Sequence, residues 1–248
     1  MMKNYFRVLM IAVLGLACSF KNERVVDDLA GSGANSPKHD AWSALLKANV
    51  TSIGNVDYQG ISGDERFEQY LNLLMSSHPD DTWTKNERMA FWINAYNAYT
   101  VKLINDNWPV KSIKDISNPW GKSFIQIENA TYSLEDIEHK ILRKKFDDPR
   151  IHFAINCASV SCPKLQNYAF IDVKLNAQLE ESAVEFMNDP VRNVVTKDNA
   201  QISKIFDWFK GDFTKNGSLK AYINKYSKIK VSEEGKLSYM DYNWKLNK

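Results

Sequence analysis

Apolar residues surround the whole helical circumference between residues 85 and 105. Thr84 is followed three residues later by Glu87, the arrangement of a capping box, so we predict a helix over 85–105. Because this helix has no polar face, we expect it to lie buried at the centre of a domain. Asn94 and Asn97, one turn apart, must then find partners inside. We favour backbone contacts for them and keep both as candidate binding residues.

A second helix is predicted over residues 134–146, with Ser133 as its N-cap. At the helical period, Glu138 falls near the middle of the apolar arc, and His139 lies on its flank. A carboxylate that faces a core should be paired or have a perturbed pKa, because burying an unpaired ion is costly. A structural ion pair with an arginine and a functional role for Glu138 both stay open.

Residues 150–156 alternate, with isoleucine and phenylalanine on one face and polar or small residues, His152 among them, on the other. This pattern predicts a short strand. A small, polar turn follows, with Cys157 at the strand exit and Cys162 before Pro163. A histidine and two thiols within about a dozen residues make this stretch the strongest candidate for a site.

The remaining pattern alternates short hairpins with helices. Hairpins are predicted to start at residue 124 and to join 191–196 with 201–206, and helices are predicted over 172–187 and 218–226. We therefore predict an α+β fold: a single mixed domain over 41–248, with a central buried helix, several helices and short antiparallel hairpins. Seven Trp, eleven Tyr and twelve Phe supply large side chains for its core.

The first residues have a different character. Lys3 and Arg7 precede an apolar run at 8–16 that is too short to span a bilayer, and Ala17 stands before Cys18. This resembles a bacterial lipoprotein signal, so we expect a signal peptide over 1–17 and a lipid on Cys18. The protein would then sit on the cell envelope, at the periplasmic face or the cell surface, with the membrane as a partner through this anchor. An ordinary secretory peptide is the alternative.

Residues 18–40 are polar and small and lack periodicity, so we expect a flexible tether. A docked arm is the alternative. The charge of the chain is balanced, with 32 Lys and Arg against 30 Asp and Glu, and the two counts become equal without Lys3 and Arg7. Because basic clusters are also absent from the sequence, we expect no nucleic-acid partner.

Five phrases, in order, resemble one family, the domain-of-unknown-function 547 family. They are RMAFWINAYNAYT, SLEDIEHKILR, RIHFAINCASVSCPKL, ISKIFDWFKGDF and YNWKLN, and together they span roughly residues 85–247. The family carries no settled activity to this chain. The resemblance directs attention to Glu138, His152, Cys157 and Cys162, and to Asn94 and Asn97. The chain departs from the family at Asn243, where many relatives are expected to have Asp.

Three interpretations of the cysteine stretch compete. In the first, Cys157 is a nucleophile, His152 its base and Glu138 the group that orients the imidazole. In the second, Cys157 and Cys162 form a disulfide, as an even number of thiols in an exported domain favours. In the third, His139, His152 and the two thiols bind zinc, with Glu138 as a ligand or base, although their spacing matches no compact zinc site.

We therefore predict a cysteine-dependent hydrolase or acyl transferase that acts on cell-envelope amide or ester substrates, with Cys157, His152 and Glu138 as catalytic residues. His139, Asn94 and Asn97 are candidate binding residues. No metal and no cofactor are expected. The alternative is a non-catalytic envelope binding or structural module with a Cys157–Cys162 disulfide, in which aromatic residues around Trp108 and Trp120 hold a ligand.

Overall fold

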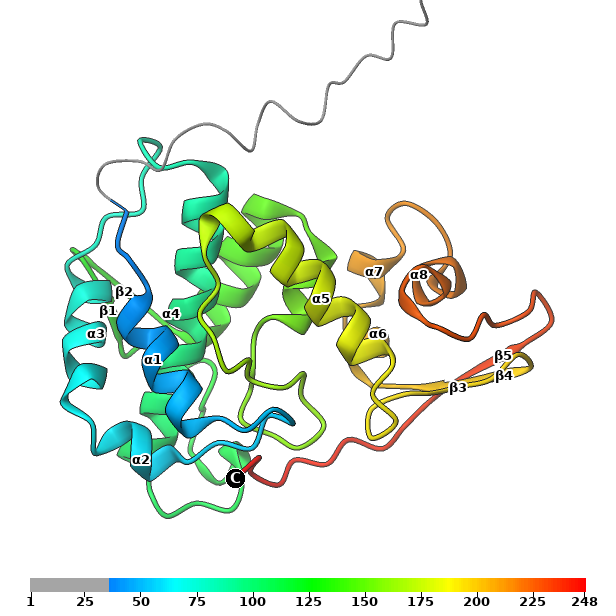
Figure 1. The fold of residues 1–248 in the computed structure, drawn as a ribbon, viewed down its shortest axis with the longest axis horizontal. Coiled ribbons are helices and arrows are strands. Elements are labelled where there is room, and N and C mark those ends of the chain that lie inside the picture. The colour runs from blue at the N-terminus through cyan, green and yellow to red at the C-terminus, as the bar shows by residue number, and fades with distance from the viewer. Residues whose placement is uncertain (1–35) are drawn as a thin grey trace, which may run out of the picture. The chain divides into compact units, whose positions relative to one another are not determined.

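The computed structural model describes residues 36–248 (Figure 1). The predicted signal peptide over 1–17, the lipidation of Cys18 and most of the predicted tether over 18–40 lie outside these residues. Within the described part of the chain, no helix combines the length and the apolar character that crossing a membrane requires.

The helix at the centre of the fold is α4, Lys85–Asp106. Its capping box forms as predicted: the Thr84 hydroxyl accepts from the Glu87 N–H, and the Glu87 carboxylate accepts from the Thr84 N–H. Sixteen of its residues are buried, on every side of the helix, so the predicted central position is confirmed. Helices α2 (Tyr58–Ser62) and α3 (Glu65–Met75) pack against it, and α1 (Asp40–Asn49) packs against α2 and α3.

A connection from α4 contains the short 3-10 helix η2, Ile113–Asp115, and the hairpin of β1 (Ile125–Ile127) and β2 (Ala130–Tyr132). The predicted second helix begins at Leu134, with the Ser133 hydroxyl accepting from a backbone N–H of its first turn. From Asp136 to Phe146 it is the π-helix η3, whose turns are wider than those of an α-helix. It packs directly against α4.

The predicted strand over 150–156 is wrong. Residues Pro149–Phe153 form the 3-10 helix η4 instead, with Pro149 in its first turn and the Asp148 carboxylate accepting from the Arg150 N–H. The alternating pattern does not indicate a strand here, because residues 151–156 are all buried, His152 and Asn156 included. A segment covered on every side has no solvent-facing positions, so its apolar spacing does not report its conformation.

Helix α5, Leu175–Met187, follows the 3-10 turn η5 at Asp172–Lys174 and joins two hydrophobic cores. Leu175 and Leu179 belong to the core around α4, whereas Ala183, Phe186 and Met187 belong to a second core. Figure 1 shows α5 running from the helices α1–α4 toward the elements that build this second core.

The second core is built by short elements near the C-terminus. These are β3 (Val194–Val195), β4 (Asn199–Ile202), α6 (Ile205–Trp208), α7 (Lys210–Phe213), α8 (Leu219–Tyr226) and β5 (Lys236–Tyr239). Strands β3 and β4 form a hairpin where one was predicted, but its second arm is Asn199–Ile202 rather than 201–206, because the helix α6 begins at Ile205. Strand β5 adds to β4 in parallel. Segregated helices and small sheets confirm the α+β class.

After β5 the chain returns to the first core as an extended segment, residues 240–248 (Figure 1). Backbone hydrogen bonds join it to the cysteine stretch: Val160 donates to the Lys245 carbonyl and Ser161 to the Asn243 carbonyl. Farther on, Val56 donates to the Asn247 carbonyl. This C-terminal segment therefore lies across the loop that carries both cysteines.

Candidate active site

A cavity of about 440 Å³ lies where α4, η3, η4, the cysteine loop, α6 and the C-terminal segment meet. We define the cysteine loop as residues 156–163. The titratable groups on the cavity wall include Glu138, His139, His152, Cys157, Cys162 and Tyr242. Candidate site residues that come from separate parts of the sequence therefore line one cavity.

Cys157 is the thiol best placed to react. Its Sγ lies 2.9 Å from Cys162 Sγ, 3.4 Å from Ser159 Oγ and 3.3 Å from the Tyr242 hydroxyl. The hydrogen bond with Cys162, supported by those with Ser159 and Tyr242, outweighs burial and lowers the pKa of Cys157 to about 7. A large fraction of this thiol is therefore thiolate, the nucleophilic form, at neutral pH.

Glu138 faces the same cavity from η3 and is almost fully buried. Its Oε2 lies 3.4 Å from the Tyr96 hydroxyl on α4. Burial, and then the negative charge of Cys157, raise the pKa of Glu138 to about 7, against the opposing effect of Arg143. Two groups that lose protons near neutral pH, a thiol and a carboxyl, are therefore electrostatically linked in one cavity.

His152 pairs with a carboxylate that the sequence analysis did not single out. Its Nε2 lies 2.8 Å from Oδ2 of Asp212 on α7, and its ring stacks on Phe209 at 4.1 Å between centroids. The predicted partner, Glu138, bonds Tyr96 instead. Burial lowers the pKa of His152 against the effect of Asp212. A neutral imidazole that bonds a carboxylate through Nε2 carries its proton there and keeps Nδ1 as an acceptor.

The Asp212 carboxylate accepts hydrogen bonds from two side chains, His152 and Arg143. Arg143 of η3 binds it with Nε 2.6 Å from Oδ2 and Nη2 3.2 Å from Oδ1, a two-pronged contact. Burial opposes ionisation, but hydrogen bonds from His152 and Arg143 hold the pKa of Asp212 well below its ordinary value. The carboxylate therefore fixes His152 to η3 as well as to α7.

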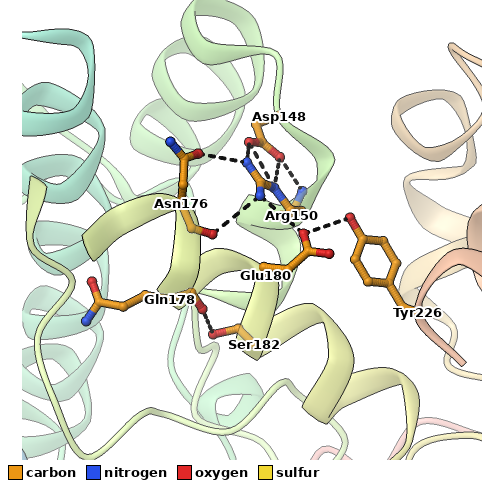
Figure 2. Close-up of polar contacts among 7 residues, drawn as sticks. All are labelled: Asp148, Arg150, Asn176, Gln178, Glu180, Ser182 and Tyr226. Carbon is orange, nitrogen blue, oxygen red and sulfur yellow. Dashed lines mark hydrogen bonds and ion pairs between the residues drawn. The ribbon is translucent and has the colours of Figure 1, made fainter. Parts of the chain in front are cut away.

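The helix that carries His152 is fixed to α5 through Arg150 (Figure 2). The guanidinium forks onto the Asp148 carboxylate and also contacts the Asn176 side chain and Glu180 on α5. Tyr226 of α8 donates to the same Glu180 carboxylate. Because the Arg150 side chain is mostly buried, this network is a stronger constraint than an exposed ion pair, and it holds η4 against α5.

The two candidate asparagines of α4 do not line the cavity. Asn94 forms a pair of hydrogen bonds with the Phe170 backbone, and Asn97 bonds the Ala154 carbonyl and the Asn156 N–H. Their amides are therefore committed to backbone, as the structural interpretation expects. Asn97 still matters for the site, because it fixes the start of the cysteine loop.

His139 does line the cavity, on the flank of η3, half-buried. Its Nδ1 lies 3.0 Å from Arg143 Nη1. Burial, and then the charge of Arg143, lower its pKa. Asn243, at the position where the family is expected to have Asp, accepts a hydrogen bond from the Lys245 N–H. Asp212, and not residue 243, is the acid that bonds the site histidine.

Aromatic rings form another wall of the cavity: Trp120, Trp208, Phe209, Tyr242 and Trp244. Trp208 stacks on Trp244 with centroids 5.8 Å apart, and Tyr242 packs against Trp244 at 4.5 Å. Trp208 is 47% exposed, so part of this wall faces solvent. Trp120 was predicted among ligand-holding aromatics; Trp108 instead contacts Tyr58, away from this cavity.

The disulfide and zinc interpretations have no counterpart in the described residues. Cys157 and Cys162 are both free thiols. Within residues 36–248, no three His, Cys, Asp or Glu side chains are arranged to hold a metal ion.

Comparison with known proteins supports the family resemblance. Residues 81–187 match the model of the family described as protein of unknown function, DUF547. The matched segment contains α4, η3, η4, the cysteine loop and α5, and so carries Glu138, His152, Cys157 and Cys162. Searches of the curated proteins and of the solved structures gave no match.

Proposed function

We propose that this protein is a cysteine-dependent acyl-transfer enzyme, a hydrolase or acyl transferase, in which Cys157 attacks amide or ester substrates. The observation that carries the proposal is the Cys157 thiol in the cavity wall with its pKa lowered to about 7. Glu138, with a pKa raised to about 7, supplies an acid and base in the same cavity.

The reaction would proceed in two steps. The Cys157 thiolate bonds to the carbonyl carbon, and the electron pair that moves to oxygen returns as the bond to the amine or alcohol breaks. The neutral Glu138 carboxyl gives its proton to that leaving group. Water, or a second acceptor, then loses a proton to the Glu138 carboxylate and attacks the thioester, which restores the Cys157 thiolate.

The His152–Asp212 pair is the second proton-carrying arrangement on the wall, and it differs from Glu138 in one respect. Its imidazole Nε2 is occupied by Asp212, and its position is fixed by Arg143 and by the Arg150 network. The pKa of Glu138 responds to the charge of Cys157, whereas that of His152 does not, so we assign the proton transfer to Glu138 and to His152 the positioning of the wall between η3 and α7.

The aromatic wall suits a substrate with an apolar or flat group beside its carbonyl, since Trp208, Tyr242 and Trp244 offer ring faces next to Cys157. The same rings favour a second candidate function, non-catalytic ligand binding in this cavity. A lipid on Cys18 would place either activity at the bacterial cell envelope, with envelope amides or esters as substrates; the basic start, short apolar run and Ala17-Cys18 support this location.

Mass spectrometry after exposure to a panel of activated esters tests the acyl-transfer proposal. We expect an acyl group on the Cys157 peptide, and none in Cys157→Ala. Glu138→Gln should still be acylated by a nitrophenyl ester, whose leaving group needs no proton, but should lose cleavage of the matching amide by roughly 10²–10⁴-fold.

Two further variants, His152→Gln and His78→Gln, are measured in the same ester and amide assays. His78 is exposed and lies outside the cavity, so its variant controls for loss of a histidine. If no ester acylates the free thiol of Cys157, the proposal is wrong. If His152→Gln rather than Glu138→Gln loses amide cleavage selectively, the proton transfer belongs to His152.

A further inference from the structure

The two thiols of the cysteine loop lie in direct contact. Their Sγ atoms are 2.9 Å apart, and the Cys157 N–H also donates to Cys162 Sγ at 2.9 Å. In the proposed acyl transfer Cys162 acts only through the hydrogen bond that lowers the pKa of Cys157, and it does not itself react. Cys162 itself is 3% exposed.

The loop holds this contact through hydrogen bonds of its own. The Asn156 side chain bonds the backbone at both ends of the cysteine loop: its Oδ1 accepts from the Ala158 N–H at 2.9 Å, and its Nδ2 donates to the Pro163 carbonyl at 2.7 Å. The Cys162 N–H donates to the Ser159 carbonyl at 3.1 Å. Because the backbone already brings the sulfurs together, a bond between them needs little rearrangement.

Contacts from outside the loop fix it further. Arg192 donates through Nε to the Cys162 carbonyl at 2.6 Å, and the C-terminal segment bonds Val160 and Ser161. Both thiols line the cavity, but Cys157 is partly exposed whereas Cys162 is buried. A small molecule that enters the cavity therefore reaches Cys157 first.

The two thiols also differ in acidity. Burial and the hydrogen bond with Cys157 raise the pKa of Cys162 well above the usual range, whereas the pKa of Cys157 is lowered. In thiol–disulfide exchange the more acidic, accessible thiol attacks and leaves readily, and the second thiol resolves the mixed disulfide. The loop contains one cysteine of each kind.

We propose that Cys157 and Cys162 form a reversible dithiol–disulfide couple that exchanges with small disulfides and thiols entering the cavity. The Cys157 thiolate attacks one sulfur of a disulfide RSSR, so the S–S bond breaks and RS⁻ leaves. Cys162 then loses its proton and attacks Cys157 Sγ, which releases the second RS⁻. In total the protein dithiol is oxidised to the Cys157–Cys162 disulfide and RSSR is reduced to two RSH; an external thiol reverses the sequence.

This couple shares the nucleophile with the proposed acyl transfer but does not depend on an acyl substrate. Where both hold, oxidation removes the Cys157 thiolate and stops acyl transfer, so the second sulfur regulates the first. The two proposals can therefore fail separately.

The test is equilibration of the full chain in buffers with stepped ratios of glutathione to glutathione disulfide. After acid quench and alkylation, peptide mass spectrometry should find both Cys157 and Cys162 alkylated at the reducing end. At the oxidising end it should find a linked Cys157–Cys162 peptide, two hydrogens lighter than the dithiol form, with no glutathione on either of these two residues. Adding excess reduced glutathione should restore both thiols.

Two variants isolate the steps, with circular dichroism to show that each remains folded. At the oxidising end, Cys162→Ser should retain glutathione on Cys157 as a mixed disulfide, because the variant has no neighbouring thiol to resolve it. Cys157→Ser should stay unmodified at the buried Cys162. If the wild-type protein keeps two free thiols at the oxidising end, or retains glutathione on Cys157, the couple is refuted. Ester acylation of the reduced protein, measured separately, reports on the proposed function alone.

Discussion

The rate at which iodoacetamide alkylates Cys157, measured against pH, should follow a thiol with a pKa of about 7. Against an ordinary thiol pKa of 9.0, a pKa of about 7 gives roughly 50-fold more thiolate at pH 7. A thiolate with a pKa lower by about two is intrinsically about tenfold less nucleophilic. Cys157 should therefore react about fivefold faster than the reference thiol at pH 7.

The larger thiolate fraction of Cys157 dominates its rate at pH 7, but its lower intrinsic nucleophilicity dominates at high pH. Above about pH 9 both thiols are largely ionised, so only the lower intrinsic reactivity remains and Cys157 should become the slower of the two by about tenfold. The two pH profiles must therefore cross. A general block to entry of the reagent would lower the Cys157 rate equally at every pH and would not move its midpoint.

The assay is timed alkylation followed by peptide mapping, which separates Cys157 from Cys162. Cys162→Ala should move the Cys157 midpoint to higher pH, because its hydrogen bond is the largest contribution that favours the Cys157 thiolate. Ser161→Ala changes a neighbouring residue whose hydroxyl accepts from the Asn243 N–H, and it should leave the midpoint unchanged. A wild-type midpoint at or above 8.5 would refute the reasoning.

Three further predictions concern stability and location. Burial lowers the pKa of His39 to about 4, so below pH 6.5 the unfolded chain binds a proton that the folded chain excludes. The free energy of unfolding should therefore fall by about 3 kcal/mol between pH 6.5 and pH 4. Urea unfolding at stepped pH measures this fall, and His39→Gln should reduce it. Trp92→Ala, at a site 6% exposed, should cost about 3–5 kcal/mol in a reversible melt, whereas a loss below about 1 kcal/mol would contradict its burial. Mass spectrometry of the native protein should find an acylated Cys18 at its N-terminus, and an unmodified terminus elsewhere would contradict the lipid anchor.

Helices with a local signal could be predicted from the sequence. The capping box at Thr84 predicts where α4 begins, and the apolar residues around its whole circumference predict that it is buried. Ser133 and Ser218 cap the helices that were predicted to follow them. Each of these signals lies within a few residues of the element that it starts. The parallel addition of β5 to β4 has no such signal, because the two strands are far apart in sequence and their pairing depends on the path of the chain between them.

The candidate site shows the same division. Cys157, Cys162 and His152 are close in sequence and were expected together, and Glu138 could be found because a carboxylate on an apolar helix face is unusual. Asp212 carries no comparable signal: it follows Gly211 in a short helix and reaches His152 only through the packing of α7 on η4. Tyr242, which contacts the Cys157 thiol, likewise depends on the return of the C-terminal segment.

The wrong strand at 150–156 and the wrong partner for His152 share one physical cause. A buried 3-10 turn and a buried strand both present apolar residues without a polar face, so period alone does not separate them. The local evidence that does separate them is Asp148-Pro149, a helix start, because the Asp148 carboxylate caps the turn. Arg150 then ties this turn to Asn176 and Glu180 of α5. The turn presents the His152 ring to Phe209 and Asp212. The pKa of Glu138 responds to the charge of Cys157, whereas the charges that act on His152 are those of Asp212, Arg143 and His139. This is why the proton transfer in the proposed reaction is assigned to Glu138 rather than to His152.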